Sequence, residues 1–356
     1  MNIATGKRSL GRAVTVGAAL FGVVVSASAQ APAPSRFLTA VANGGIPAVV
    51  RPAADLAAHV PGPELTWIDS IFIAGRVHGG GHSFGILIHT IDLPNADQRK
   101  LFVGITDTST GWYRNYQALV SKSQYTWSRK GLQIRMPGLT WTGSARRMQV
   151  KASTPWGSLH AQFTPEGPVL NYSGIGLAKL LSDVDHEYAF PTMRTVGTLT
   201  AEGRRRRISG VSWLDRQWGP VPVTDPSMRW TWMNITLCNG DQLAIWDTLN
   251  NRAQQSWVTV LRPDGSYELA AVRPLARGAS RLWTSPMTHK TYPTHWRIDI
   301  PALRSRLRVV VSGPRGQEFP DGHIEATAAV TGRYKGGKVT GTTYVEMTGD
   351  WRAHPR

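Results

Sequence analysis

The residues best suited to chemistry in this sequence surround one acidic side chain, Asp215, in the segment GVSWLDRQWGP. Trp213 lies two positions earlier, so on a β-strand the two side chains point to the same face, and Trp218 follows closely. Upstream, His186 and Tyr188 are also two positions apart, in DHEYAFPTMR. An acid and a histidine among aromatic rings could protonate an alkene and shelter the cation that forms.

This chemistry places specific demands on each group. Asp215 must be protonated near neutral pH, which requires an apolar pocket that raises its pKa. His186 could orient water or take back a proton, because the pKa of imidazole lies near neutrality. An aromatic ring within about 6 Å stabilises a cation by roughly 0.5–2 kcal/mol. The candidate rings and substrate-binding side chains are Trp213, Trp218, Tyr188, Trp230 and Arg229.

The alternative for Asp215 is a structural role. A carboxylate at the rim of a β-barrel, paired with Arg216 or Arg229, would contribute to folding and not to catalysis. The sequence leaves both interpretations open.

A second segment, GRVHGGGHSFGILIHT, contains two short hydrolase signatures, an HGGG oxyanion-hole motif and a G-x-S-x-G nucleophile elbow at Ser83. The elbow requires a strand that turns sharply into a helix. Here β-rich segments stand on both sides of the glycines, which predicts a β-hairpin instead. The nearby His78, His82 and His89 have no further ligand at a fixed spacing, so we predict no metal site.

The N-terminal residues have the features of an export signal. Three basic residues precede an apolar stretch, and Ala27-Ser28-Ala29 is a small-residue cleavage site. We therefore predict a signal peptide over residues 1–29 and a soluble protein that is periplasmic or secreted. Cys238 is the single cysteine, so no internal disulfide can form.

The chain is strongly basic, with a formal net charge of +17. In an exported protein this charge favours peripheral association with an anionic envelope surface, such as lipid headgroups or polymers, over nucleic acid. The densest basic cluster is Arg204–Arg207. We expect a solvated hairpin turn there, with an anion-binding site as the alternative.

Short β-like runs separated by turn signals, with 36 glycines, predict an all-β protein. The two halves also begin alike, with LTWIDSIFIAGRVHGGGHSFGILIHT and MRWTWMNITLCNGDQLAIWDTLN. Each is a tryptophan-bearing strand, a glycine turn and an apolar strand. Because one such hairpin cannot bury its own faces, we predict two successive β-barrel domains, over residues 37–205 and 206–352.

The segment GVSWLDRQWG resembles the G-x-x-W-x-D-x-x-W-G signature of the superfamily of carotenoid 1,2-hydratases (hydroxyneurosporene synthases) and AttH-like proteins. YPTHWRIDIP, TTYVEMTGDW and the hairpin from Trp67 match in order, so the resemblance spans most of the chain. It implies two lipocalin-like β-barrels. It also implies that Asp215 is the proton donor, supported by Trp213 and by the upstream pair His186 and Tyr188.

These observations predict an exported hydro-lyase or cyclase that acts without a cofactor on a small apolar molecule, either an isoprenoid, a lipid or a polyketide-like compound. The chain has no Rossmann or P-loop motif, so no nucleotide cofactor is expected. Two alternatives stay open: a non-catalytic carrier of a lipophilic ligand, in which Asp215 is structural, and a secreted serine esterase.

Overall fold

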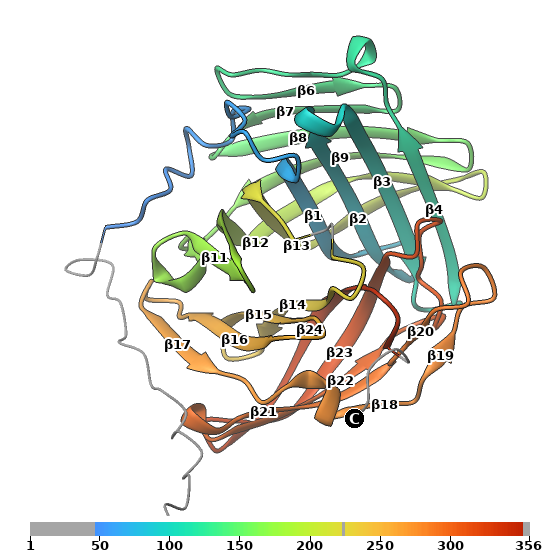
Figure 1. Ribbon diagram of the computed structural model, residues 1–356. Helices are drawn as coiled ribbons and strands as arrows, with labels where there is room; N and C mark the ends of the chain where they lie inside the picture. The colour runs from blue at the N-terminus through green and yellow to red at the C-terminus, as the bar shows by residue number, and fades with distance from the viewer. Residues whose placement is uncertain (1–46, 223–224, 352–356) are drawn as a thin grey trace, which may run out of the picture. The chain divides into compact units, whose positions relative to one another are not determined.

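The computed structural model describes residues 47–222 and 225–351, which are built mainly from antiparallel β-strands (Figure 1). The described residues contain no α-helix and five short 3-10 helices: η1 (Pro94–Ala96), η2 (Lys122–Gln124), η3 (Tyr172–Gly174), η4 (Leu275–Arg277) and η5 (Pro301–Leu303). None of these helices has the length and apolar character needed to span a membrane. The predicted signal peptide, residues 1–29, lies outside the described residues.

The first sheet has the strand order β4-β3-β2-β1-β13-β12-β9-β8-β7-β6-β5, and β10 and β11 also pair with β12. Its strands are β1 (Trp67–Gly79), β2 (His82–Leu93), β3 (Gln98–Asp107), β4 (Trp112–Leu119), β5 (Thr126–Trp127), β6 (Leu132–Met136), β7 (Leu139–Ser144), β8 (Arg147–Thr154), β9 (Gly157–Pro165), β10 (Leu170–Asn171), β11 (Leu177–Leu180), β12 (Asp183–Ala201) and β13 (Arg204–Pro220). The sheet curls around a hydrophobic core of its own (Figure 1).

The second sheet has the order β17-β16-β15-β14-β24-β23-β22-β21-β18, and β19 and β20 form a small separate sheet. The strands are β14 (Arg229–Leu237), β15 (Gln242–Leu249), β16 (Gln254–Leu261), β17 (Tyr267–Ala271), β18 (Ala279–Ser280), β19 (Trp283–Thr284), β20 (Thr291–Tyr292), β21 (His295–Ile300), β22 (Ser305–Val311), β23 (Ile324–Tyr334) and β24 (Gly337–Thr348). It also curls around its own core. The prediction of an all-β fold with two lipocalin-like barrels is confirmed.

The chain passes from one sheet to the other later than the predicted boundary. β13 pairs with β1 up to Pro220, and the second sheet begins at Arg229. Residues 205 and 206 lie inside β13, directly after a tight turn at Glu202 and Gly203. The arginines that follow this turn are mostly exposed, as expected for a solvated hairpin. The basic run therefore begins a long strand of the first sheet, and the passage to the second sheet comes after that strand.

The glycine-rich segment forms the predicted hairpin. Gly80 and Gly81, with φ angles of 60° and 79°, make a two-residue turn between β1 and β2. Two successive positive φ angles suit this turn to the twist of the strands, and glycine adopts them without strain. Ser83 lies on β2 opposite His78. The strand-to-helix turn that a nucleophile elbow requires is absent from this segment, so the esterase interpretation is wrong.

The two sheets pack against each other through a third hydrophobic cluster. β1 shows the principle, because its side chains alternate between two cores. Ile71 and Ile73 belong to the core of the first sheet, whereas Phe72 and Ala74 belong to the cluster between the sheets. A strand buried on both faces reads as continuously apolar, and this explains the run IFIA, residues 71–74, in β1.

Candidate active site

A cavity of about 400 Å³ lies between the two sheets and is lined by strands from both. Its apolar wall is Ile68, Phe72, Ile91, Leu93, Phe102, Leu180, Val221, Trp230, Trp232 and Trp246. Its polar lining includes Ser70, His89, Lys100, Glu187, Asp215, Gln217, Lys290, Asp321, His323 and Glu346. An aromatic cavity with a few converging polar groups is typical of a small-molecule site.

Asp215 lines this cavity, and two aromatic side chains hydrogen-bond its carboxyl group. Trp213 Nε1–H donates to Oδ2 at 2.8 Å, and the Tyr172 hydroxyl donates to Oδ1 at 3.0 Å. Trp232 Nε1–H in turn donates to the Tyr172 hydroxyl at 3.0 Å. Burial raises the pKa of Asp215 to about 8, although both hydrogen bonds act to lower it. Asp215 is therefore a buried acid that keeps its proton at neutral pH.

Two other carboxyl groups in the cavity also accept a hydrogen bond from a tryptophan. Trp246 Nε1–H donates to Glu187 Oε2 at 3.1 Å, and Trp230 Nε1–H donates to Glu346 Oε1 at 2.6 Å. Burial, with the negative charges of nearby acids, raises the pKa of Glu187 well above its ordinary value. The indoles thus hold the acids in place while their rings form the apolar wall.

His89 adds a second kind of polar group to the cavity. Its Nε2 is 2.8 Å from the Ser70 hydroxyl, and its ring contacts Phe72 edge to face, with the ring centres 5.3 Å apart. Its Nδ1 has no hydrogen-bond partner among the described residues. Burial lowers the pKa of His89 to about 3, so the imidazole is neutral. A neutral imidazole can hold a water molecule beside a bound substrate.

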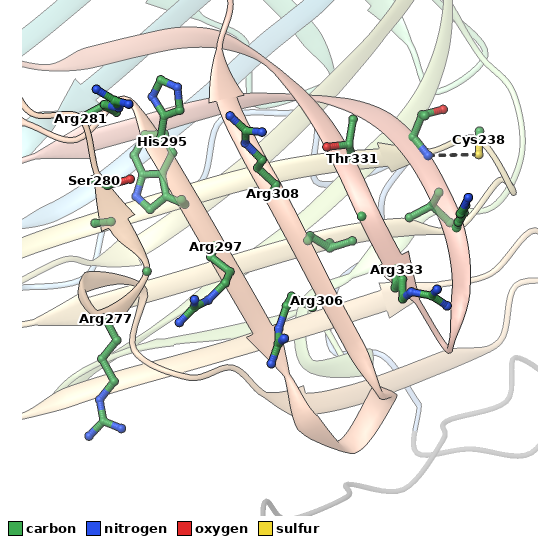
Figure 2. Close-up of a pocket in the computed structure, with 18 residues that line it drawn as sticks. Cys238, Arg277, Ser280, Arg281, His295, Arg297, Arg306, Arg308, Thr331 and Arg333 are labelled. Atoms are coloured by element: carbon green, nitrogen blue, oxygen red, sulfur yellow. Dashed lines mark hydrogen bonds between the residues drawn. The ribbon is translucent and has the colours of Figure 1, made fainter.

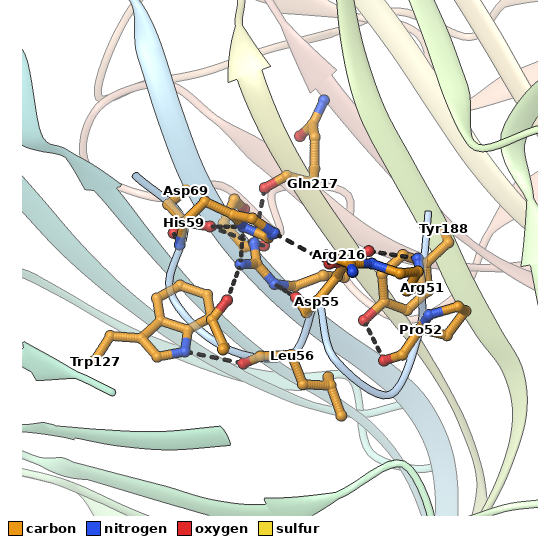
Figure 3. A network of polar contacts seen from close by, with 12 residues as sticks. Arg51, Pro52, Asp55, Leu56, His59, Asp69, Trp127, Tyr188, Arg216 and Gln217 are labelled. Atoms are coloured by element: carbon orange, nitrogen blue, oxygen red, sulfur yellow. Dashed lines mark hydrogen bonds and ion pairs between the residues drawn. The ribbon is translucent and has the colours of Figure 1, made fainter. Parts of the chain in front are cut away.

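Arg216, the residue after Asp215, points to the other face of β13 and is the centre of a polar network (Figure 3). Its guanidinium pairs with Asp69 at 2.5 Å and donates to the carbonyl oxygens of Asp55, Ala57 and Ser70 at 2.8–3.0 Å. Arg216 is therefore committed to Asp69. Among the described residues no lysine or arginine forms an ion pair with Asp215.

Three of the predicted site residues lie on this same face, away from the cavity. In the register of β12 and β13, His186 is opposite Trp218 and Tyr188 is opposite Arg216, so these four side chains share a face. His186 stacks on Trp218, with ring centres 5.0 Å apart, and the Tyr188 hydroxyl donates to the Pro52 carbonyl. The expectation that His186, Tyr188 and Trp218 converge with Asp215 on one pocket is wrong.

A β-bulge between Phe190 and Met193 explains the error for His186 and Tyr188, whereas Trp218 is three residues after Asp215 on β13 and faces the other side by strand alternation. Phe190 is paired with Leu214 and Met193 with Ser212, so the register shifts by one residue between them. A shift of one residue moves every following side chain to the opposite face. Without the bulge, His186 and Tyr188 would share the face of Asp215. With it, Glu187 faces the cavity in their place.

The remaining predictions divide between the cavity and the second barrel. Trp213 contacts Asp215, and Trp230 lines the cavity, as expected. Arg229 precedes Trp230 on β14 and points away from the cavity. There its guanidinium lies over the Trp351 ring, 5.3 Å from the ring centre, and donates to the Asp350 carbonyl. Arg229 therefore does not line the site.

A second hollow, of about 1140 Å³, lies over β18 and β21–β24 and has a different chemistry (Figure 2). It is open and basic, with Arg277, Arg281, Arg297, Arg306, Arg308, Arg333 and Lys338 in its lining. His295 also lines it. Burial and the charges of Arg308 and Arg281 lower the pKa of His295. Among the described residues that line the hollow there is no acid comparable to Asp215, so we place the candidate active site in the smaller cavity.

A sequence model of the AttH-like family matches residues 98–350, well over half of the chain. The chain belongs to the AttH-like family. This confirms the resemblance seen in GVSWLDRQWG.

Curated relatives of this AttH-like protein include dehydratase asqC of Emericella nidulans and kievitone hydratase of Fusarium solani subsp. phaseoli. The first is 25% identical over 51% of the chain and 54% of the relative, and the second is 24% identical over 39% and 41%. The chain thus spans about half the length, or less, of the curated relatives it matches. The crystal structure of kievitone hydratase from Nectria haematococca superposes with a TM-score of 0.74 at 17% identity, covering 90% of this chain and 98% of that one. This likeness shows a shared fold.

Sequence reasoning missed most of the cavity. Tyr172, Glu187 and His89 line it or hydrogen-bond its acids, yet they come from three separate elements, η3, β12 and β2, and share no local motif. Only DHEYAFPTMR offered a signal, because Glu187 stands between the two residues that were chosen. His323 and Glu346 belong to distant segments, and only the folded sheets bring them together.

Proposed function

We propose that this AttH-like protein is a hydro-lyase that adds water to, or removes it from, a small and largely apolar molecule in the cavity between the sheets. The observation that carries the proposal is Asp215, a buried acid that faces an aromatic cavity and has no cation partner among the described residues. The names of the two curated relatives, a dehydratase and a hydratase, support the reaction class.

In the hydration direction, Asp215 gives its proton to one carbon of a substrate double bond. The π electrons form the new C–H bond, and the other carbon becomes a cation. The rings of Trp230, Trp232 and Trp246 line the cavity and can stabilise this charge. Cation stabilisation favours an isoprenoid or polyketide-like alkene with a substituted double bond.

Water completes the reaction. A water molecule held by His89 attacks the cation, and the oxonium that forms releases one proton to solvent, which leaves a neutral alcohol. His89 takes over the role expected of His186, because its imidazole lines the cavity and its Nδ1 is without a partner among the described residues. Asp215 regains a proton from solvent, so the net reaction is alkene plus water to alcohol.

The test is Asp215→Asn, which keeps the shape of the protonated acid but removes the transferable proton. Turnover of an alkene from an isoprenoid and polyketide panel, followed as heavy-oxygen incorporation from labelled water, should fall by about 10²–10⁴. Ligand affinity should change little, and the melting temperature should hold or rise, because a desolvated carboxyl has gone.

Three outcomes would contradict this assignment. Full turnover in Asp215→Asn would show that the acid lies elsewhere. If Asp215→Asn binds ligands as the wild type does and the wild type converts none of the alkenes, the protein would instead be a lipophilic-ligand carrier. A large drop in melting temperature, with activity falling only as the folded fraction falls, would assign Asp215 a structural role.

We also propose that the basic hollow of the second sheet binds an anionic lipid surface. Four of its arginines, Arg297, Arg306, Arg308 and Arg333, stand on the neighbouring strands β21–β23, and Arg308 has no ion-pair partner among the described residues (Figure 2). Arg306→Ser with Arg308→Ser should reduce sedimentation with phosphatidylglycerol vesicles, whereas Arg204→Ser with Arg205→Ser, at the β12–β13 turn, should not. Sedimentation of the first variant at the wild-type level, or equal binding to neutral vesicles, would reject the proposal.

Export of the chain is a further proposal. It rests on the basic and apolar residues before Ala27-Ser28-Ala29. N-terminal sequencing of periplasmic protein should begin at or near Gln30, and recovery of Met1 there would contradict it.

A further inference from the structure

Three ionisable side chains that the hydration step does not use meet beside the cavity. They are His323, Glu325 and Glu346, and their ligand atoms all lie within 4.8 Å of one another. His323 Nε2 is 3.3 Å from Glu325 Oε1 and 3.6 Å from Glu346 Oε1. None of the histidines around the glycine-rich hairpin takes part in this group.

The two glutamates are direct neighbours across β23 and β24. Like charges directly opposite each other on antiparallel strands destabilise a sheet, and burial adds the loss of their hydration. Glu325 is 3% exposed, and neither of its carboxyl oxygens has a hydrogen-bond partner among the described residues. A cation bound by both carboxyl groups would relieve this repulsion.

We propose that His323, Glu325 and Glu346 form a binding site for a divalent transition metal ion, for which Zn²⁺ is the best match. One imidazole nitrogen and two carboxylate oxygens are ligands that Zn²⁺ uses. Ligands about 2.0–2.1 Å from a tetrahedral ion lie about 3.4 Å from each other. The separations of 3.3 Å and 3.6 Å lie on either side of this value.

The position of the site at the cavity wall would let the ion bind water or a substrate oxygen inside the cavity. His323 and Glu346 line the cavity, whereas Glu325 is not among the lining residues. The hydrogen bond from Trp230 to Glu346 would orient this ligand, as outer-shell contacts do in metal sites. Three protein ligands leave a fourth position for a water molecule or a substrate oxygen. Binding of the ion does not depend on the proposed hydration.

The experiment measures metal binding directly. Full-length protein is stripped with a chelator and titrated with Zn²⁺ by calorimetry and with Co²⁺ by visible absorption. We expect one ion per chain and a higher melting temperature with metal. Glu325→Gln keeps the size of the side chain and should weaken Zn²⁺ binding by at least about 100-fold, the upper figure for loss of an outer-shell partner.

Two variants serve as controls. Glu187→Gln removes another buried acid of the cavity, and His82→Ala removes a histidine that is paired with Asp107; both should bind Zn²⁺ like the wild type. If Glu325→Gln does not fold, His323→Asn, placed before β23, takes its place. The proposal is overturned if the stripped wild type binds neither ion, if both ligand variants bind at wild-type affinity, or if His82→Ala abolishes binding. Since no turnover is measured, failure of the hydro-lyase proposal leaves this result intact.

Discussion

Asp215 and Arg216 are consecutive, both are buried, and they have opposite environments. Arg216 points into the first barrel, where Asp69 neutralises its charge and backbone carbonyls accept its N–H groups (Figure 3). Asp215 points between the sheets, where indole and phenol groups hold it and burial keeps it protonated.

The difference separates stability from chemistry on the two faces of a single strand. A buried charge such as Arg216, whose hydrogen-bond and ion-pair partners are all in place, stabilises the fold and has no proton available for transfer. A buried acid that is held only by neutral donors can give up a proton. Four changes test this contrast. The largest effect should come from the face of β13 that carries Arg216, where the ion pair with Asp69 lies.

Replacement of Arg216 by Met should cause the greatest loss of stability. The change removes the guanidinium paired with Asp69, a residue that is 3% exposed, and, among the described residues, leaves only His59 in contact with its carboxylate. An uncompensated buried charge costs roughly 3–5 kcal/mol, which chemical denaturation can measure. Arg194→Met removes an exposed ion pair with Glu166 and serves as the control. If both variants unfold at the same denaturant concentration, the network does not hold the fold.

The pH dependence of the hydration rate and of the stability should come from Asp215, on the face of β13 that lines the cavity. Hydration needs protonated Asp215, so its rate should fall about tenfold per pH unit above pH 8. The free energy of unfolding should depend on the protonation of the same carboxyl group. The folded chain holds it up to about pH 8, whereas an unfolded aspartate releases it near pH 4. This contribution is therefore complete below about pH 4 and is lost as the pH rises to about 8. Asp215→Asn should lack this slope, and an unchanged slope would show that another group is responsible.

Tyr172→Phe should have a smaller effect, an upward shift of the pH at which the hydration rate falls. Its hydroxyl donates to Asp215, which lowers the pKa of the acid against the effect of burial. Loss of one such bond, worth about 0.5–1.5 kcal/mol, should move the alkaline limb of the rate profile upward by up to about one pH unit. Tyr188→Phe removes a hydroxyl from the other face and should leave the limb in place. A downward shift in Tyr172→Phe would contradict the geometry.

His186→Phe should have the smallest effect on turnover. The ring stacks on Trp218 on the Arg216 side of the sheet, and phenylalanine preserves this contact. We expect a rate within about twofold of the wild type, as for substitutions away from any special site. A loss as large as that of Asp215→Asn would return His186 to the catalytic set.

The sequence predicted what depends on local spacing. Trp213 and Asp215 are two apart on one strand, and they do share a face and a hydrogen bond. Alternating and apolar runs likewise predicted the all-β fold. The error for His186 and Tyr188 arose between strands, where one extra residue near Pro191 shifts the register and turns Glu187 toward the cavity, whereas the offset of three residues already places Trp218 on the face opposite to Asp215. No local sequence pattern predicts such a bulge, and none predicts that Tyr172 hydrogen-bonds Asp215 from another segment of the chain.

The pairing of three cavity acids each with an indole of its own has a practical consequence. Trp213, Trp246 and Trp230 donate to Asp215, Glu187 and Glu346. Indole emission responds to a charge placed at its nitrogen, so gain or loss of a proton on any of these acids should change the intrinsic fluorescence of the protein. The cavity would then report its own ionisation optically, and titrations of single tryptophan-to-phenylalanine variants could follow each acid before any substrate has been identified.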